Sequence, residues 1–200
     1  MRYLLVINFY ILLCYSLGCN AQNEPYKINI TQSNDSVGLY NISYSIIDYN
    51  LSGLLIYKKI NDSCYRAIIT SEMGPKILDM YMYKNEYKLN YAIKQLNRKI
   101  IIKSFYNDLV SISGLNYREK STETTIFDSI SAKQIIVDKK NKIVISNNAS
   151  KKQSNVVFSH KNKKELTIDY FYSSIEIQTD SIFLKHYNYK MEMVLRKIKF

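Results

Sequence analysis

Short runs in which apolar and polar residues alternate fill most of the chain between residues 37 and 200. The clearest run covers residues 76–84, where Leu78, Met80 and Met82 occupy one side of an extended backbone. A period of two places successive side chains on opposite faces of a sheet. The alternation therefore predicts an antiparallel sheet with one apolar face.

Polar turns separate these runs at regular intervals. Residues 61–63 (Asn-Asp-Ser) and the pair Gly74-Pro75 have the composition of tight turns, and Gly53 is expected to mark a bulge or bend. Such spacing favours a meander that curls into a barrel or half-barrel. The predicted strands are residues 37–47, 51–60, 64–70, 76–84, 87–91, 133–138, 142–146, 156–159, 166–172, 174–178, 182–187 and 191–198.

One segment, from about residue 92 to residue 112, changes period. Its apolar residues recur at steps of mostly three and four, which predicts a helix that packs against the sheet. Asn90 is expected to cap its start, and Ser113-Gly114 to end it. The predicted fold class is mainly β (α+β): an antiparallel curved sheet or half-barrel with one long helix. No second linker appears, so residues 37–200 are predicted to form one domain.

The start of the chain has the pattern of a signal peptide. Met1-Arg2 precedes fifteen apolar-rich residues, 3–17, whereas a membrane-spanning helix needs about 20. Residues 1–18 are therefore interpreted as a signal peptide. Residues 19–36 are polar and contain Pro25, as expected of a flexible tether.

Cys19 is the predicted site of lipidation, because Gly18-Cys19 at the end of the apolar run resembles the lipobox of bacterial lipoproteins. Leu17 and Ser16 depart from the usual lipobox order. Cleavage after Ala21, which would release a soluble secreted or periplasmic protein, therefore stays open. With lipidation, the expected address is the cell envelope, with the domain anchored by its N-terminal lipid and facing the periplasm.

The net charge of +11 is compatible with nucleic acid, with anionic membranes, or with solubility alone. An exported protein rarely meets nucleic acid, which is therefore excluded as an expected partner. Anionic lipid head groups are the better class of partner. Lysines on exposed strands would also keep a sheet soluble without any partner.

No catalytic or metal-binding constellation stands out. His160 and His186 are too few and too far apart to predict a zinc site, and both are expected at the surface. Cys64 is expected to be a buried structural residue. Glu72 and Asp79 could face each other across a turn, although a salt bridge or turn cap explains such carboxylates better. We expect no catalytic residue, no metal and no cofactor, and therefore no enzyme.

A discontinuous stretch carries a resemblance to known proteins. It consists of SGLLIYKK (52–59), YR (65–66), TSEMG (70–74), LDM (78–80), NRK (97–99) and FYNDL (105–109). The stretch resembles a group of small uncharacterised bacterial envelope lipoproteins over residues 39–112, which implies an address and no activity. The order of strands, helix and strands is also similar to lipoprotein-localisation and lipoprotein-carrier half-barrels, which implies a sheet that holds an acyl chain against helices.

Two functions follow as expectations. The first is a module that binds or carries lipid or lipoprotein acyl chains. The second is a non-catalytic structural or accessory subunit of an envelope protein complex, with a sheet face or edge as the contact surface. An apolar cavity that opens to solvent would favour the first function.

Overall fold

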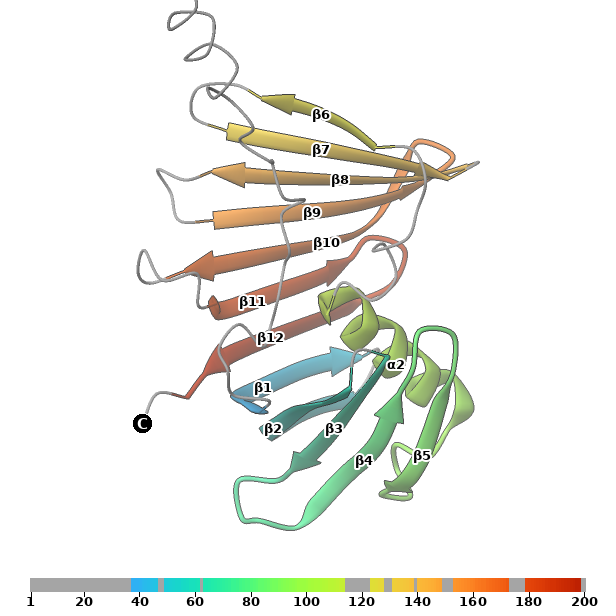
Figure 1. Cartoon of the computed structure of the whole chain (residues 1–200). Coiled ribbons are helices and arrows are strands. Elements are labelled where there is room, and N and C mark those ends of the chain that lie inside the picture. Colours follow the sequence, from blue (N-terminus) through green and yellow to red (C-terminus); the bar gives the residue numbers. More distant parts are fainter. Residues whose placement is uncertain are drawn as a thin grey trace, which may run out of the picture.

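The computed structural model describes residues 37–46, 49–61, 63–113, 123–127, 131–138, 140–148, 153–172 and 179–198. The signal peptide, Cys19 and the tether therefore lie outside the described residues. Figure 1 shows a single curved sheet with a helix against one part of it. In the described segments no cis peptide bond occurs.

The sheet contains twelve described strands, and each is antiparallel to its neighbours. Its order is β5-β4-β3-β2-β1-β12-β11-β10-β9-β8-β7-β6, with β5 and β6 at the two open edges. The strands are β1 (Val37–Ile46), β2 (Tyr49–Asn61), β3 (Cys64–Thr70), β4 (Lys76–Met82), β5 (Tyr87–Ala92), β6 (Glu123–Phe127), β7 (Ser131–Asp138), β8 (Asn141–Asn148), β9 (Gln153–His160), β10 (Lys163–Tyr172), β11 (Thr179–His186) and β12 (Met191–Lys197). The helix is α2 (Lys99–Ser113).

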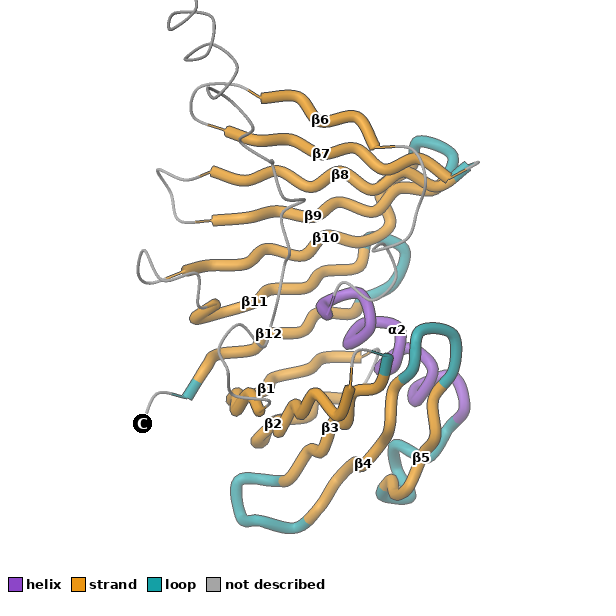
Figure 2. The backbone as a smooth tube through the Cα atoms, viewed as in Figure 1, coloured by secondary structure: helices purple, strands orange, loops and turns teal. Residues whose placement is uncertain are grey.

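The two halves of the sheet meet where β1 pairs with β12. Tyr44 lies opposite Met193 and Ile46 opposite Met191 in this register. The chain thus forms β1 to β5, crosses the sheet through α2, and returns strand by strand from β6 to β12. Figure 2 shows this path along the backbone.

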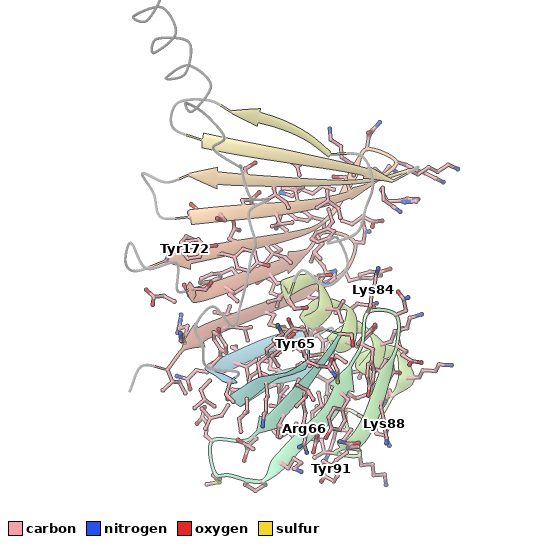
Figure 3. All side chains as sticks on the ribbon, viewed as in Figure 1. Tyr65, Arg66, Lys84, Lys88, Tyr91 and Tyr172 are labelled. Atoms are coloured by element: carbon pink, nitrogen blue, oxygen red, sulfur yellow. The ribbon has the colours of Figure 1, made fainter. Side chains whose placement is uncertain are left out.

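The core lies between α2 and the face of the sheet that the helix covers, which we call the inner face; the opposite one is the outer face. In β1 the alternation places Tyr40, Ile42 and Tyr44 on the inner face, where they are fully or almost fully buried. The ring of Tyr44 meets Phe105 of α2 edge to face, with centroids 4.5 Å apart. Figure 3 shows side chains crowded between α2 and the β1–β5 half.

The helix begins at Lys99, so the prediction of a start near residue 92 was wrong. Ala92 still pairs with Leu78 as part of β5, and the Ile93 amide donates to the Ile77 carbonyl oxygen. Leu96 is buried although it lies in a turn. Its spacing from the neighbouring apolar residues is that of a helix, but its backbone is not helical. Asn90 does not cap a helix, because its side-chain amide donates to Asp79 instead.

The predicted fold class is confirmed: the sheet is antiparallel, curved and unclosed, with one helix in the described chain. The expected strand at 64–70 matches β3, and most others grow by a few residues. Strand β6 was not predicted. The expected strand at 174–178 lies outside the described residues.

Two glycines have different structural roles. At Gly53, a β-carbon would lie 2.0 Å from the carbonyl oxygen of Thr70 on β3. The β1–β2 register runs through Gly53 without a shift, so the residue does not form the expected bulge against β1 and instead permits a close approach to the β3 backbone. Gly74 has φ of 98° in the turn before β4, where its amide donates to the Ser71 carbonyl, as the predicted turn requires.

Candidate ligand-binding cavity and its surroundings

The C-terminal half of α2 is fixed to both halves of the sheet by tyrosine hydroxyl groups. Tyr106 of α2 donates a hydrogen bond of 2.8 Å to the Tyr83 carbonyl oxygen in the β4–β5 turn. Tyr170 of β10 donates one of 2.9 Å to the Ile112 carbonyl oxygen near the end of the helix. These bonds fix the C-terminal half of α2 between the β4–β5 turn and the inner face of β10.

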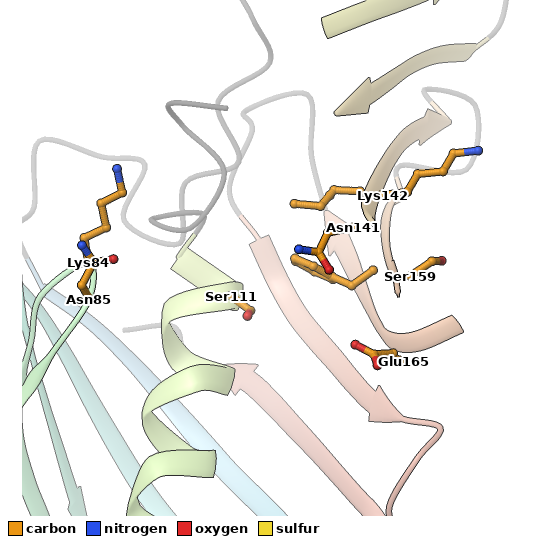
Figure 4. A pocket seen from close by; sticks show the side chains of 9 residues that line it. Lys84, Asn85, Ser111, Asn141, Lys142, Ser159 and Glu165 are labelled. Carbon is orange, nitrogen blue, oxygen red and sulfur yellow. The ribbon is translucent and has the colours of Figure 1, made fainter. Parts of the chain in front are cut away.

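A cavity of about 340 Å³ lies between the β4–β5 turn, the end of α2 and strands β8–β10 (Figure 4). Its volume is at the lower end of the roughly 300–1,000 Å³ that small-molecule pockets occupy. It is lined by Lys84, Asn85, Ser111, Asn141, Lys142, Ile143, Phe158, Ser159 and Glu165.

The apolar part of this cavity comes from one row of side chains across the sheet. In the strand registers His186 pairs with Leu166, Leu166 with Phe158, and Phe158 with Ile143. Because His186 contacts α2, this whole row points to the inner face. Ile143 and Phe158 therefore extend the apolar inner face beyond the end of the helix.

The rim of the cavity is polar and carries both signs of charge. Lys84 comes from the β4–β5 turn, whereas Lys142 and Glu165 come from β8 and β10. Figure 4 shows Lys84 and Asn85 on one side of the cavity, with the strand residues across from them. An apolar floor under amide groups, two lysines and one glutamate suits an amphiphile with an apolar chain and a polar end.

A buried carboxylate next to this region ties α2 to two strands. Asp108 accepts a hydrogen bond of 2.8 Å from the Tyr44 hydroxyl group. Its other oxygen lies 2.7 Å from His186 Nε2. Burial, and secondarily the Asp108 charge, raises the pKa of Tyr44 well above its ordinary value. The expectation of a surface role for His186 was therefore wrong.

The second histidine stays at the end of the sheet. His160 Nδ1 lies 2.8 Å from Asn141 Oδ1 in an exposed contact between β9 and β8. Among the described residues, no group of three or more His, Cys, Asp or Glu side chains is arranged to hold a metal ion. Cys64 is buried with a free thiol, in agreement with a structural role.

Asp79 is the centre of an ionic cluster on the outer face. Arg66 donates two hydrogen bonds to it, from Nε at 3.0 Å and from Nη2 at 2.9 Å, and Lys76 Nζ lies 3.0 Å away. The hydrogen bonds from Arg66 are the largest cause that lowers the pKa of Asp79 to about 2. The salt-bridge interpretation of Asp79 is confirmed, and Glu72 is exposed in the preceding turn.

The outer face also has an apolar groove of about 390 Å³ over β10–β12. Phe171 and Phe183 both line it, with their rings edge to face and 5.6 Å between centroids. Lys185 and Glu192 pair at 2.7 Å beside it. Phe183 remains 39% exposed, so this surface is apolar and open to solvent.

No family model matches the sequence, and no curated protein matches it. Solved structures do match the fold. A LolA superfamily protein from Nitrosomonas europaea is similar with a TM-score of 0.53 and 11% identity, over 86% of this chain and 88% of that one. A putative outer membrane lipoprotein-sorting protein domain from Vibrio parahaemolyticus is a weaker match, with a TM-score of 0.45, 11% identity and coverage of 85% and 86%.

At these identities the likeness to the Nitrosomonas protein is one of fold, and it confirms the predicted half-barrel. In the described parts of the chain, no helix is both long and apolar enough to cross a membrane. The residues that line the cavity come from five separate segments between positions 84 and 165. No local motif marks them, so the sequence alone could not group them.

Proposed function

We propose that this protein binds an acyl chain of a lipid or lipoprotein in the cavity between α2 and the inner face of β8–β10. The observation that carries the proposal is the cavity itself. Its floor of Ile143 and Phe158 continues the apolar core, and its rim opens to solvent with Lys84 and Lys142. The likeness to a LolA superfamily protein supports a carrier of this kind, because lipoprotein-carrier half-barrels hold acyl chains between sheet and helices.

Binding would use burial for affinity and charge for orientation. An acyl chain would lie against Phe158 and Ile143, where each buried methylene group contributes about 0.8 kcal/mol. An anionic or polar end would remain at the rim near Lys84 and Lys142. This function requires no reaction, in keeping with a non-enzymatic binding protein.

The address of the protein is part of the proposal. Residues 1–18 would direct export, Cys19 would carry a lipid anchor, and residues 19–36 would tether the domain on the periplasmic side. The intact mass of the mature protein tests this directly. A lipid-modified Cys19 at the new N-terminus supports the anchor, whereas a free residue after Ala21 supports a soluble protein in its place.

The cavity is tested by two substitutions on one strand. Phe158→Ser removes apolar surface from the cavity, whereas Val157→Ser removes it from the outer face of the same strand, β9. Each purified protein is extracted under native conditions, its lipids are identified by mass spectrometry, and its affinity for a fluorescent fatty acid is measured. We expect bound lipid in the wild type and in Val157→Ser, and at least about tenfold weaker binding in Phe158→Ser. Equal binding by all three proteins, or no binding, would refute the proposal.

The outer-face groove favours a second candidate, an accessory subunit of an envelope complex. The half-buried Phe171 and the exposed Phe183 in this groove form an edge-to-face pair that suits a protein contact. Phe183→Ser should leave the fold and fatty-acid binding intact and abolish recovery of a partner in a mild-detergent pull-down. If Phe183→Ser recovers the same proteins as the wild type, this surface has no such role.

A further inference from the structure

Three neighbouring turns at one end of the sheet present a cluster of lysines, which we call the basic turn surface. Its exposed cations are Lys140 and Lys142 at the β7–β8 turn, Lys161, Lys163 and Lys164 at the β9–β10 turn, and Lys190 at the β11–β12 turn. The turns lie side by side: the Lys161 amide donates to the Lys140 carbonyl, and the Tyr187 amide to the Glu165 carbonyl. Figure 3 shows nitrogen-tipped side chains projecting beyond these strand ends.

Few acidic residues flank this surface: Asp138, which is opposite Asn141 in the strand register, and Glu165. Residues 140–142 (KNK), 160–164 (HKNKK) and 187–190 (YNYK) contain no acidic residue. The adjacent Glu165 is half-buried and accepts a hydrogen bond from Asn188. The six lysines repel one another and create a local positive potential. Binding of an anionic partner would reduce this repulsion.

Two exposed aromatic residues lie among these cations. Tyr187 is 48% exposed and Tyr189 is 65% exposed. Lys164 Nζ lies 4.3 Å from the centroid of the Tyr187 ring. Tyrosine and lysine side by side are typical of surfaces at the membrane interface, where the rings sit at head-group level and the cations meet anionic lipids.

The backbone conformation of Lys161 in the β9–β10 turn is unfavourable for a lysine. Lys161 and Asn162 have φ of 49° and 64°, the left-handed values of a two-residue hairpin. Glycine or asparagine adopts this conformation most easily, whereas a lysine there is sterically disfavoured. A lysine at the tip is therefore explained better by its charge than by the stability of the turn.

We propose that the basic turn surface docks the protein on an anionic lipid bilayer. Asn141, Lys142 and Glu165 belong both to these strand ends and to the cavity lining. Docking would therefore place the cavity next to the membrane surface. The proposal goes beyond acyl-chain binding and does not depend on it, because the lysines and tyrosines would bind head groups even if the cavity held nothing.

Vesicle flotation tests docking, and every protein compared, the one with wild-type turns included, carries Cys19→Ser so that no N-terminal lipid holds it on neutral vesicles. Vesicles of phosphatidylcholine alone are compared with vesicles that contain phosphatidylglycerol. The test variant carries Lys161→Glu, Lys163→Glu and Lys164→Glu. Its matched control changes charge equally at exposed lysines elsewhere on the fold, with Lys58→Glu, Lys88→Glu and Lys94→Glu.

We expect the protein with wild-type turns to prefer anionic vesicles, the test variant to bind them at least about tenfold more weakly, and the control variant to change less than about twofold. Every variant keeps the same N-terminal residues, so the comparison isolates the turns. Three results would overturn docking: equal binding to neutral vesicles, no loss in the test variant, or an equal loss in both variants, which would show a response to net charge alone. A protein that captures an acidic partner but no vesicle would also refute it.

Fluorescence locates the contact independently of charge. The chain has no tryptophan, so Tyr189→Trp creates a unique probe on the basic turn surface. Tyr91→Trp provides a matched probe on β5, where the tyrosine is 45% exposed. With brominated phosphatidylglycerol vesicles, we expect quenching and a blue shift at position 189 only. Equal quenching at both positions, or none at position 189, would contradict the proposed orientation.

Discussion

The Asp108 carboxylate of α2 lies 2.7 Å from His186 Nε2 at the end of β11, although 78 residues separate them in the chain. The same carboxylate accepts a hydrogen bond from the hydroxyl group of Tyr44 on β1. Since the Asp108 side chain is 1% exposed and that of His186 15%, the carboxylate depends on these partners and not on water. The contact thus joins the helix to both halves of the sheet.

Loss of the imidazole should therefore destabilise the fold. His186→Leu leaves Asp108 buried with only the tyrosine as a partner, and we expect the free energy of unfolding to fall by about 3 kcal/mol. Urea denaturation followed by circular dichroism measures it. His160→Leu, at the exposed contact with Asn141, is the control and should cost less than about 0.5 kcal/mol. Similar losses at both histidines would contradict a special role for the Asp108 pair.

The lowered pKa of Asp79 predicts that the fold becomes less stable in acid. Its folded pKa of about 2 lies below its ordinary value of 3.8, so it stabilises the fold above about pH 4. This contribution, about 2 kcal/mol, is lost as the pH falls through 2. Asp79→Asn should be less stable at pH 7 and should lose correspondingly less between pH 5 and pH 2 in urea titrations. Glu72→Gln, in the exposed turn, should retain the wild-type acid slope; if it flattens the slope instead, Asp79 is not the cause.

The close approach at Gly53 should tolerate no side chain. Gly53→Ala would place a methyl group 2.0 Å from the Thr70 carbonyl oxygen, which belongs to backbone and cannot rotate away. We expect β2 and β3 to separate locally, at a cost of roughly 3 kcal/mol or more. Gly74→Asn, where a β-carbon meets nothing within 4 Å, should cost about 1 kcal/mol or less. Thermal unfolding midpoints of the two variants measure the difference, and the reverse order would contradict the predicted steric origin.

Stability and docking should oppose each other at Lys161. Lys161→Gly relieves the left-handed backbone of the turn and should raise the free energy of unfolding by up to about 1 kcal/mol. The same change removes one cation and should weaken binding to anionic vesicles. Denaturation and flotation of one preparation measure both effects. A variant that is less stable, or that binds vesicles more tightly, would show that the charge is not kept at the expense of the turn.

The sheet was predictable because apolar and polar residues alternate along many of its strands, and burial follows this alternation clearly in β1 and β2. Leu78, Met80 and Met82 lie on the predicted apolar side of β4, and all three are buried. The start of the helix was not predictable from spacing, since Ile93 and Leu96 are spaced as in a helix but belong to a strand end and a turn. The pairing of β5 with β4 in their hairpin decides between these conformations, and the spacing of the apolar residues does not reveal that pairing.

The candidate site could not be predicted because its residues are far apart in the sequence. Asp108 and His186 have no local signature, and each resembles an ordinary polar residue until the fold brings them together. The cavity unites a turn, a helix end and three strands. By contrast, the lysines at 161, 163 and 164 are visible as a basic loop in the sequence. Only the structure shows that the lysines at 140 and 190 lie in adjacent turns.

The pairing of β1 with β12 has a consequence for how the polypeptide is made. Tyr40 of β1 lies opposite Lys197 of β12, so the two halves of the sheet can join only after β12 has been synthesised. While a ribosome is still adding residues before Met191, the nascent chain can hold at most two unconnected sheets, each with an additional unpaired edge. Closure over so many intervening residues is slow. A truncation that removes β12 should therefore leave two separate, aggregation-prone fragments of structure, however complete the rest of the sheet is.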